Sequence, residues 1–149
     1  MGDSQPTYHD AELILKLYEL RREPVMREAR AYFNSLPPNA ENFFKVLADP
    51  TGKENSYVRQ VVGYWEMTAA LVNHGTLNAA LAFDTLQEIY FVYAKIKPFL
   101  PALREKTNSP DFLINMERLA ESTEDTRTRV GRVQARIMAR FAEAAKPKP

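Results

Sequence analysis

Apolar residues recur every three or four positions along most of the chain, which is the spacing of one face of an α-helix. The most regular stripe consists of Ala82, Leu86, Ile89, Tyr93, Ile96, Leu100 and Leu103. It predicts one long helix that is capped by Asn78, bends at Pro98 and Pro101, and continues to Arg104, because the stripe keeps its phase across both prolines.

Helical spacing also covers residues 10–22, 25–36, 43–47, 58–72, 112–120 and 130–141. No segment alternates apolar and polar residues as a half-buried strand would. The pattern therefore predicts an all-α fold, a single-domain bundle of about six to eight mostly antiparallel helices with no sheet. We expect residues 1–149 to form one domain, with residues 1–8 and 145–149 frayed.

Helix-end signals lie between these segments. Asn39 is a typical N-cap residue, and Gly75 is typical of the left-handed position that follows a helix. The run Ser109-Pro110-Asp111 predicts a helix start, with a capping hydroxyl and a proline at the first helical position. Ser122 and Asp125 fit a capping box for the last helix.

Charge is divided unevenly along the chain, although its net value is only +1. Residues 126–149 carry seven Lys or Arg and one acid, whereas residues 1–125 carry 13 basic and 18 acidic groups. The basic last helix either packs beside the acidic body of its own or a second copy, or attracts an anionic partner. Nucleic acid or an anionic membrane surface is the less favoured partner, because no aromatic residues interleave with the row of arginines.

Composition narrows the location of the protein. The chain has no cysteine, which excludes disulfides and thiolate chemistry. Its longest purely apolar run, residues 89–94, is far shorter than the about 20 residues that a membrane-spanning helix needs. The first residues lack the basic and apolar regions of a signal peptide, so we expect a cytoplasmic protein without a transmembrane segment.

The sequence contains no recognisable metal-binding, nucleotide-binding or catalytic motif. His9 and His74 are the two histidines, and neither has a Glu three residues before it or a second His four residues after it, the spacings of metal sites on helices. The five glycines are scattered, so no phosphate-binding loop can be drawn. We therefore predict no catalytic residue, no metal and no cofactor, and we lean towards a non-enzymatic protein.

Aromatic residues gather in the middle of the chain, with eight of the sixteen between positions 57 and 99. One interpretation is a ligand pocket between helices, lined by Tyr64, Trp65, Glu66, His74, Tyr90 and Tyr93. The other is a protein interface, because Phe83, Tyr90 and Phe91 place apolar surface on a second side of their helix. The basic row Arg129, Arg132, Arg136 and Arg140 belongs to the same predicted interface.

Several short motifs resemble a group of small all-helical bacterial proteins of unknown function. They are Tyr64-Trp65-Glu66, Leu71-Val72 with Gly75, Ile96-Lys97-Pro98-Phe99-Leu100, and Leu103-Arg104, within residues of about 55 to 122. The resemblance implies an all-α bundle and supplies no catalytic residue, substrate or cofactor.

The preferred hypothesis is a non-enzymatic protein-interaction or scaffold module that self-associates as a homodimer. The first alternative is a small-molecule-binding protein or enzyme that uses the aromatic pocket. The second alternative is a domain whose basic C-terminal helix binds anionic lipid or nucleic acid.

Overall fold

A computed structural model describes residues 4–149 of the chain. Residues 1–3, which belong to the predicted frayed N-terminus, lie outside the described residues. The elements are α1 (Tyr8–Arg21), α2 (Pro24–Ser35), α3 (Ala40–Leu47), α4 (Lys53–Asn73), α5 (Ala79–Thr85), α6 (Glu88–Ile96), the 3-10 turn η1 (Lys97–Phe99), α7 (Leu100–Lys106), α8 (Ile114–Ala120) and α9 (Glu124–Ala144). Residues 4–149 contain no β-strand. The predicted all-α fold is confirmed.

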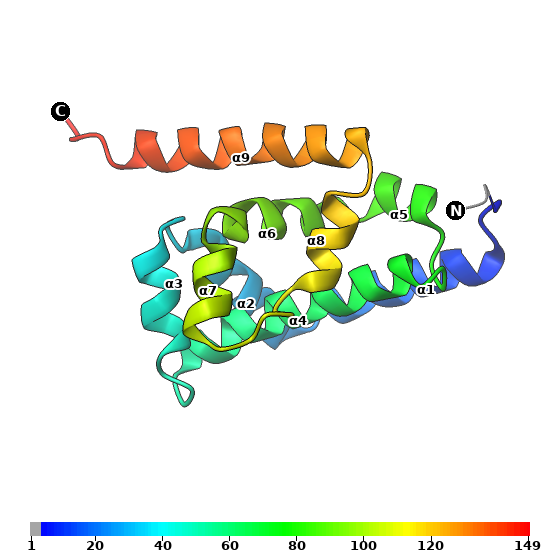
Figure 1. Ribbon diagram of the computed structural model, residues 1–149, viewed down its shortest axis with the longest axis horizontal. Coiled ribbons are helices and arrows are strands. Elements are labelled where there is room, and N and C mark those ends of the chain that lie inside the picture. The colour runs from blue at the N-terminus through cyan, green and yellow to red at the C-terminus, as the bar shows by residue number, and fades with distance from the viewer. Residues whose placement is uncertain (1–3) are drawn as a thin grey trace.

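The helices are arranged in layers. Figure 1 shows α9 at the top and α1 and α4 at the bottom. The long helix α4 packs against α2 and α8, and α6 packs against α9. Both α7 and α8 run across the direction of α4 and α9 (Figure 1). Helix α6 therefore lies between α4 and α9 and contacts both.

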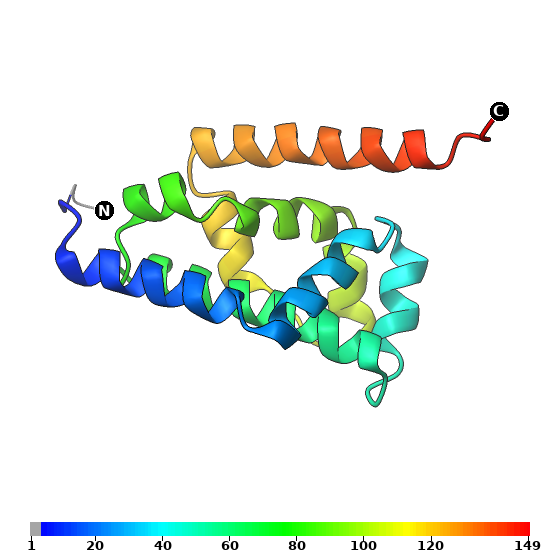
Figure 2. The same ribbon diagram turned by 180° about the vertical axis from the view of Figure 1, so that it is seen from behind.

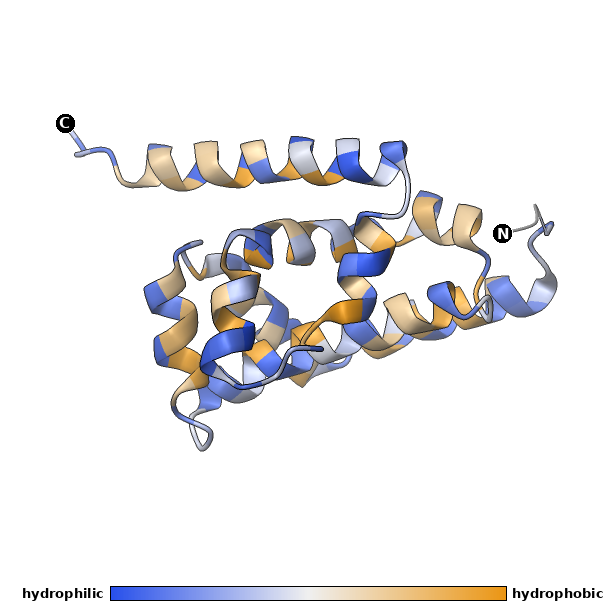
Figure 3. Cartoon of the chain, viewed as in Figure 1, coloured by the Kyte–Doolittle hydropathy of each residue, from blue (hydrophilic) through white to orange (hydrophobic). Residues whose placement is uncertain are grey.

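The core is a continuous set of apolar side chains contributed by these helices. Trp65, Phe33 and Phe43 are its largest fully buried members, and they belong to α4, α2 and α3. In Figure 3 the most hydrophobic segments of α9, coloured orange, lie on the side that faces α6, whereas the opposite side is coloured tan, white and blue. The apolar stripe of the last helix is therefore buried within the chain, with Val130 and Ile137 each exposed by 3% or less.

Several predicted helix ends are confirmed. The side chains of Asn39 and Asn78 each accept a hydrogen bond of 2.9 Å from a backbone N–H three residues later and cap α3 and α5. Gly75 follows the C-cap of α4 with a φ of 75°, the left-handed region that glycine adopts without steric cost.

The prediction of one continuous helix from Asn78 is wrong at Leu86. This residue has φ −108° and ψ 59°, and α6 starts only at Glu88. The break is stabilised by tertiary donors to carbonyls that a helix end leaves free: Tyr18 donates to the Thr85 carbonyl, and Arg129 donates to that of Phe83. The predicted bend at Pro98 is present as η1.

Two predicted helix starts are displaced. Helix α8 begins at Ile114 and not at Ser109-Pro110, because residues 110–113 form a turn that ends with Leu113 at φ 57°. Helix α9 is capped one residue later than predicted. Its capping box pairs Thr123 with Thr126, through hydrogen bonds of 3.0 and 3.1 Å, where Ser122 and Asp125 were expected.

Candidate functional site

A concave surface lies where α9 passes over α6 and the C-terminal part of α2. Figure 2 shows α2 rising towards α9 on this face of the molecule. The concavity has a volume of about 640 Å³ and is open to solvent on one side. We call it the basic groove, and its lining residues are Arg30, Asn34, Gln87, Glu88, Phe91, Arg129, Arg132, Val133, Arg136, Ile137 and Arg140.

The α9 wall of the groove carries the row of arginines that the sequence analysis singled out. Arg129 is fixed at the start of the row, with its guanidinium carbon 3.4 Å from the centre of the Phe83 ring and one nitrogen donating to the Phe83 carbonyl. Arg132, Arg136 and Arg140 are exposed. Within residues 4–149, none of these three has a carboxylate within 4.0 Å.

The opposite wall holds a charged cluster that is already paired. Arg30 of α2 donates to both carboxylate oxygens of Glu88, at 2.9 and 3.1 Å, and Arg21 of α1 donates to the same carboxylate at 2.9 Å. All three side chains are largely buried, with 14 to 25% exposure. Glu88 thus joins α1 and α2 to the first turn of α6, and its charge is balanced by two cations.

A buried lysine lies next to the groove. Lys95 of α6 is 1% exposed, and its ammonium donates to the carbonyls of Phe33 and Asn34 in the last turn of α2. Burial, and to a smaller extent the positive charge of Arg140, lowers the pKa of Lys95 to about 7. The Phe33 and Phe141 ring centres lie 5.0 and 5.1 Å from the same nitrogen, which places a cation between aromatic faces.

The lining of the groove is strongly basic. It has five arginines and one carboxylate, and the apolar side chains of Phe91, Val133 and Ile137 lie between its walls. Because the unpaired cations all belong to α9, an anionic group would bind on that side. The chemistry offered is recognition of anions beside an apolar surface, since the lining contains one carboxylate and no histidine, serine or threonine.

The six residues of the predicted aromatic pocket do not line the basic groove. Tyr64 and Trp65 contact each other edge to face, with ring centres 4.8 Å apart, and Trp65 is fully buried in the core. The Tyr64 hydroxyl donates to the Leu17 carbonyl, and burial raises its pKa to about 12. Tyr90 is 2% exposed and packs on Phe83, and burial raises its pKa.

The polar members of that predicted pocket have separate positions. Glu66 accepts hydrogen bonds from the backbone N–H groups of Asn115 and Met116, at 2.8 and 2.9 Å, so it caps the N-terminus of α8 from α4. His74 is exposed at the C-cap of α4. Tyr93 donates to Glu121 at 3.0 Å, and burial together with that carboxylate raises its pKa.

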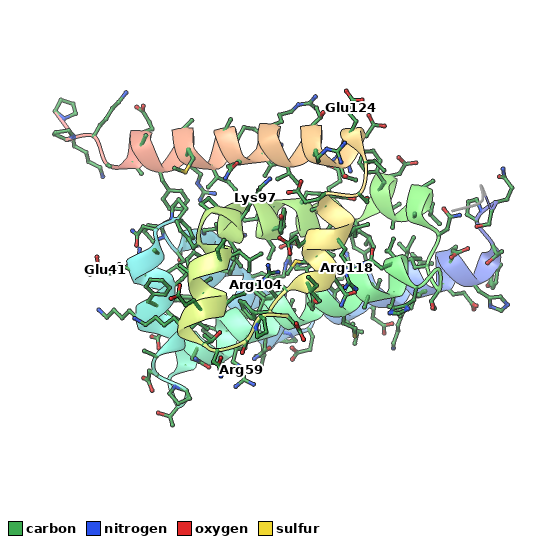
Figure 4. All side chains as sticks on the ribbon, viewed as in Figure 1. Glu41, Arg59, Lys97, Arg104, Arg118 and Glu124 are labelled. Carbon is green, nitrogen blue, oxygen red and sulfur yellow. The ribbon has the colours of Figure 1, made fainter. Side chains whose placement is uncertain are left out.

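Five members of the predicted interface set do come together, because Phe91 and the four arginines of α9 all line the groove. Two acids of the chain that could have paired with these arginines have other partners, since Glu117 binds Arg104 and Glu121 binds Lys97, at 2.7 Å each. Figure 4 labels Lys97 and Arg104 below α9.

Sequence reasoning missed Arg30 of α2, Lys95 of α6 and the pairing of Arg30 with Glu88. The one signal for Lys95 was its position between the apolar run of residues 89–94 and Ile96, in a segment that is apolar on more than one side. Nothing local indicates that Arg30 and Glu88, 58 positions apart, form a pair.

Across residues 4–149, every helix is too short or too polar to cross a membrane. The same residues contain no cluster of three or more His, Asp or Glu side chains arranged to hold a metal ion.

Comparison with known proteins places the chain in a family. No curated protein and no solved structure is similar to this chain. A model of a domain of unknown function, DUF4760, matches residues 6–123, which include the residues of the resemblance and end one position before α9. Since that match covers well over half of the sequence, the chain belongs to the DUF4760 family of domains of unknown function.

Proposed function

We propose that this chain is a non-enzymatic protein-interaction module that binds an acidic segment of a partner protein in the basic groove. The observation that carries the proposal is the set of exposed arginines on α9, Arg132, Arg136 and Arg140, with no carboxylate of residues 4–149 within 4.0 Å. Cations that line a concave surface without internal partners favour an external anion. We also propose a cytoplasmic location, in keeping with a chain that has no cysteine.

The lining favours protein over nucleic acid and lipid. Single-stranded nucleic acid binds through stacking on several aromatic faces, whereas the groove offers one aromatic residue, Phe91. A membrane surface is flat, and basic helices that bind it present their cations and apolar residues outward. In the groove, Val133 and Ile137 are buried at the base of a concavity, with 8 and 3% exposure, which suits a protein segment that enters it.

Self-association is one form of this proposal, with the acidic body of a second copy as the partner. The apolar second side that motivated a homodimer is partly covered within the chain, since Tyr90 is 2% exposed and Arg129 of α9 lies over the Phe83 ring, whereas Phe91 remains half-buried in the basic groove. A homodimer would therefore use the basic groove. Light scattering tests this form, because a dimer held by charge should dissociate as salt is raised from low to about 0.5 M.

The proposal is tested with a fluorescent glutamate- and leucine-rich peptide and with a matched peptide in which glutamine replaces every glutamate. Binding is followed by fluorescence anisotropy. We expect only the acidic peptide to bind, and to bind more weakly as salt increases. If each arginine contributes about 0.5–1 kcal/mol, as ion pairs near a surface do, the triple variant R132Q/R136Q/R140Q should bind about 10- to 150-fold more weakly.

The matched control is the triple variant R22Q/R59Q/R118Q, which removes the same net charge from exposed positions outside the groove. Figure 4 shows Arg59 and Arg118 on α4 and α8, below α9. Its affinity should change less than about threefold, since distant charges are screened. An equal loss in both variants, or no binding of the acidic peptide to the unaltered protein, would refute the proposed function.

A further inference from the structure

The spacing of the arginines on α9 indicates which kind of protein segment fits the basic groove. Arg132, Arg136 and Arg140 are four residues apart on one helix, so their Cα positions advance by about 6 Å per step. Val133 and Ile137 directly follow the first two arginines and are buried at the base of the groove. The α9 wall is thus a row of cations with an apolar row beside it.

The polarity of the two walls differs. On the far wall, Arg21 and Arg30 both bind the Glu88 carboxylate, so each of these two arginines already has a carboxylate partner. The unpaired cations belong to α9 alone. An occupant must therefore direct its acids towards α9 and its apolar residues towards Phe91, the half-buried apolar side chain of the lining.

The groove is bounded by helices and not by the edge of a sheet. An extended peptide would leave its backbone N–H and C=O groups facing apolar side chains, where unpaired polar groups are costly. A helix satisfies these groups internally, and its residues at four-residue intervals also advance by about 6 Å.

We propose that the occupant of the basic groove is an amphipathic helix of a partner protein, with carboxylates at four-residue intervals and an apolar row directly beside them. This inference rests on the proposed function and adds to it a secondary structure and a register. The partner acids pair with Arg132, Arg136 and Arg140, and the partner's apolar side chains pack on the half-buried ring of Phe91.

The test compares peptides of identical composition against the full chain by fluorescence anisotropy. The in-register peptide is an Ala-Gln helix with three glutamates at four-residue intervals, each followed by a leucine. The redistributed peptide carries the same glutamates on three different sides of the helix. We expect the in-register peptide to bind at least about tenfold more tightly, because only it can engage three arginines together.

A charge exchange assigns the register. The variant Arg136→Glu should bind the in-register peptide about tenfold more weakly, and a peptide with lysine in place of its central glutamate should recover most of that loss on this variant. Circular dichroism of the variant checks that it is folded. Arg118→Glu on α8, which is exposed and outside the groove, is the matched control and should show no such exchange.

The outcomes separate the two proposals. Equal affinity for the in-register and redistributed peptides, or no recovery in the charge exchange, overturns the helical register while an acidic partner remains supported. Failure of every acidic peptide to bind overturns the proposed function as well. Tighter binding of a single-stranded oligonucleotide than of any peptide, lost in R132Q/R136Q/R140Q, overturns both in favour of nucleic acid.

Discussion

Lys95 provides the sharpest test of the structure, because a lysine that is 1% exposed must lower its pKa or find strong partners. Here it does both, with a pKa of about 7 and two carbonyl acceptors at the end of α2. We propose the variant Lys95→Met, which keeps an unbranched apolar chain of similar length and removes the charge.

The sign of the pH effect follows from linkage. The folded pKa of about 7 lies below the ordinary value of 10.5, so between these values the unfolded chain binds more protons at Lys95 than the folded chain. The free energy of unfolding of the unaltered protein, relative to Lys95→Met, must therefore rise with pH in this window. From pH 7 to 9 the relative gain is about 2 kcal/mol, at 1.36 kcal/mol for each full proton and pH unit.

The assay is urea denaturation of both proteins at pH 7, 8 and 9, followed by far-ultraviolet circular dichroism. Other groups that titrate in this range cancel in the difference between the two proteins. Lys16→Met is the control, because Lys16 is exposed on α1 and its ammonium stays in solvent. A difference between the unaltered protein and Lys95→Met that changes by less than about 0.5 kcal/mol would show that Lys95 keeps an ordinary pKa, and the described burial would be wrong.

Two further predictions concern stability and use the same denaturation assay. Glu66→Ala should lower the free energy of unfolding by about 2 kcal/mol, because two backbone N–H groups of α8 lose a charged acceptor. Asp84→Asn, at an exposed position of α5, should change it by less than about 0.5 kcal/mol. Equal effects of the two variants would exclude the cap. Gly75→Ala should destabilise the protein by about 1 kcal/mol, because an alanine is strained at the φ of 75° found there. Gly63→Ala should stabilise the protein by about 0.5–1 kcal/mol, since Gly63 lies within helix α4 and nothing lies within 4 Å of the added Cβ. Effects of the same sign in both variants would contradict the described backbone.

Local signals were sufficient for much of the fold. The apolar stripe of α9 and the caps at Asn39, Asn78 and Gly75 depend on residues within one helical turn, so the sequence alone predicts them. The arginine row is local in the same sense, because its members share one side of a helix whatever lies opposite. That wall of the groove was therefore predictable.

The rest depended on residues far apart in the chain. The helix break at Leu86 is stabilised by Tyr18, which donates to the Thr85 carbonyl, and by Arg129, which donates to the Phe83 carbonyl. Periodicity did not reveal the break, since Leu86 is only 2% exposed and so remains part of the buried apolar stripe although the helix is interrupted there. The late start of α8 has the same kind of cause, because its cap comes from Glu66.

The cap that Glu66 supplies has a consequence for how the molecule opens. Helix α8 has seven residues, too few to persist alone, and two of its first N–H groups are bonded to α4. Amide hydrogen exchange in α8 should therefore be governed by separation from α4, so that the two helices belong to one cooperative unit. The last turns of α9, beyond Ile137, have no fully buried side chain, and their amides are free to exchange by fraying while that unit stays closed.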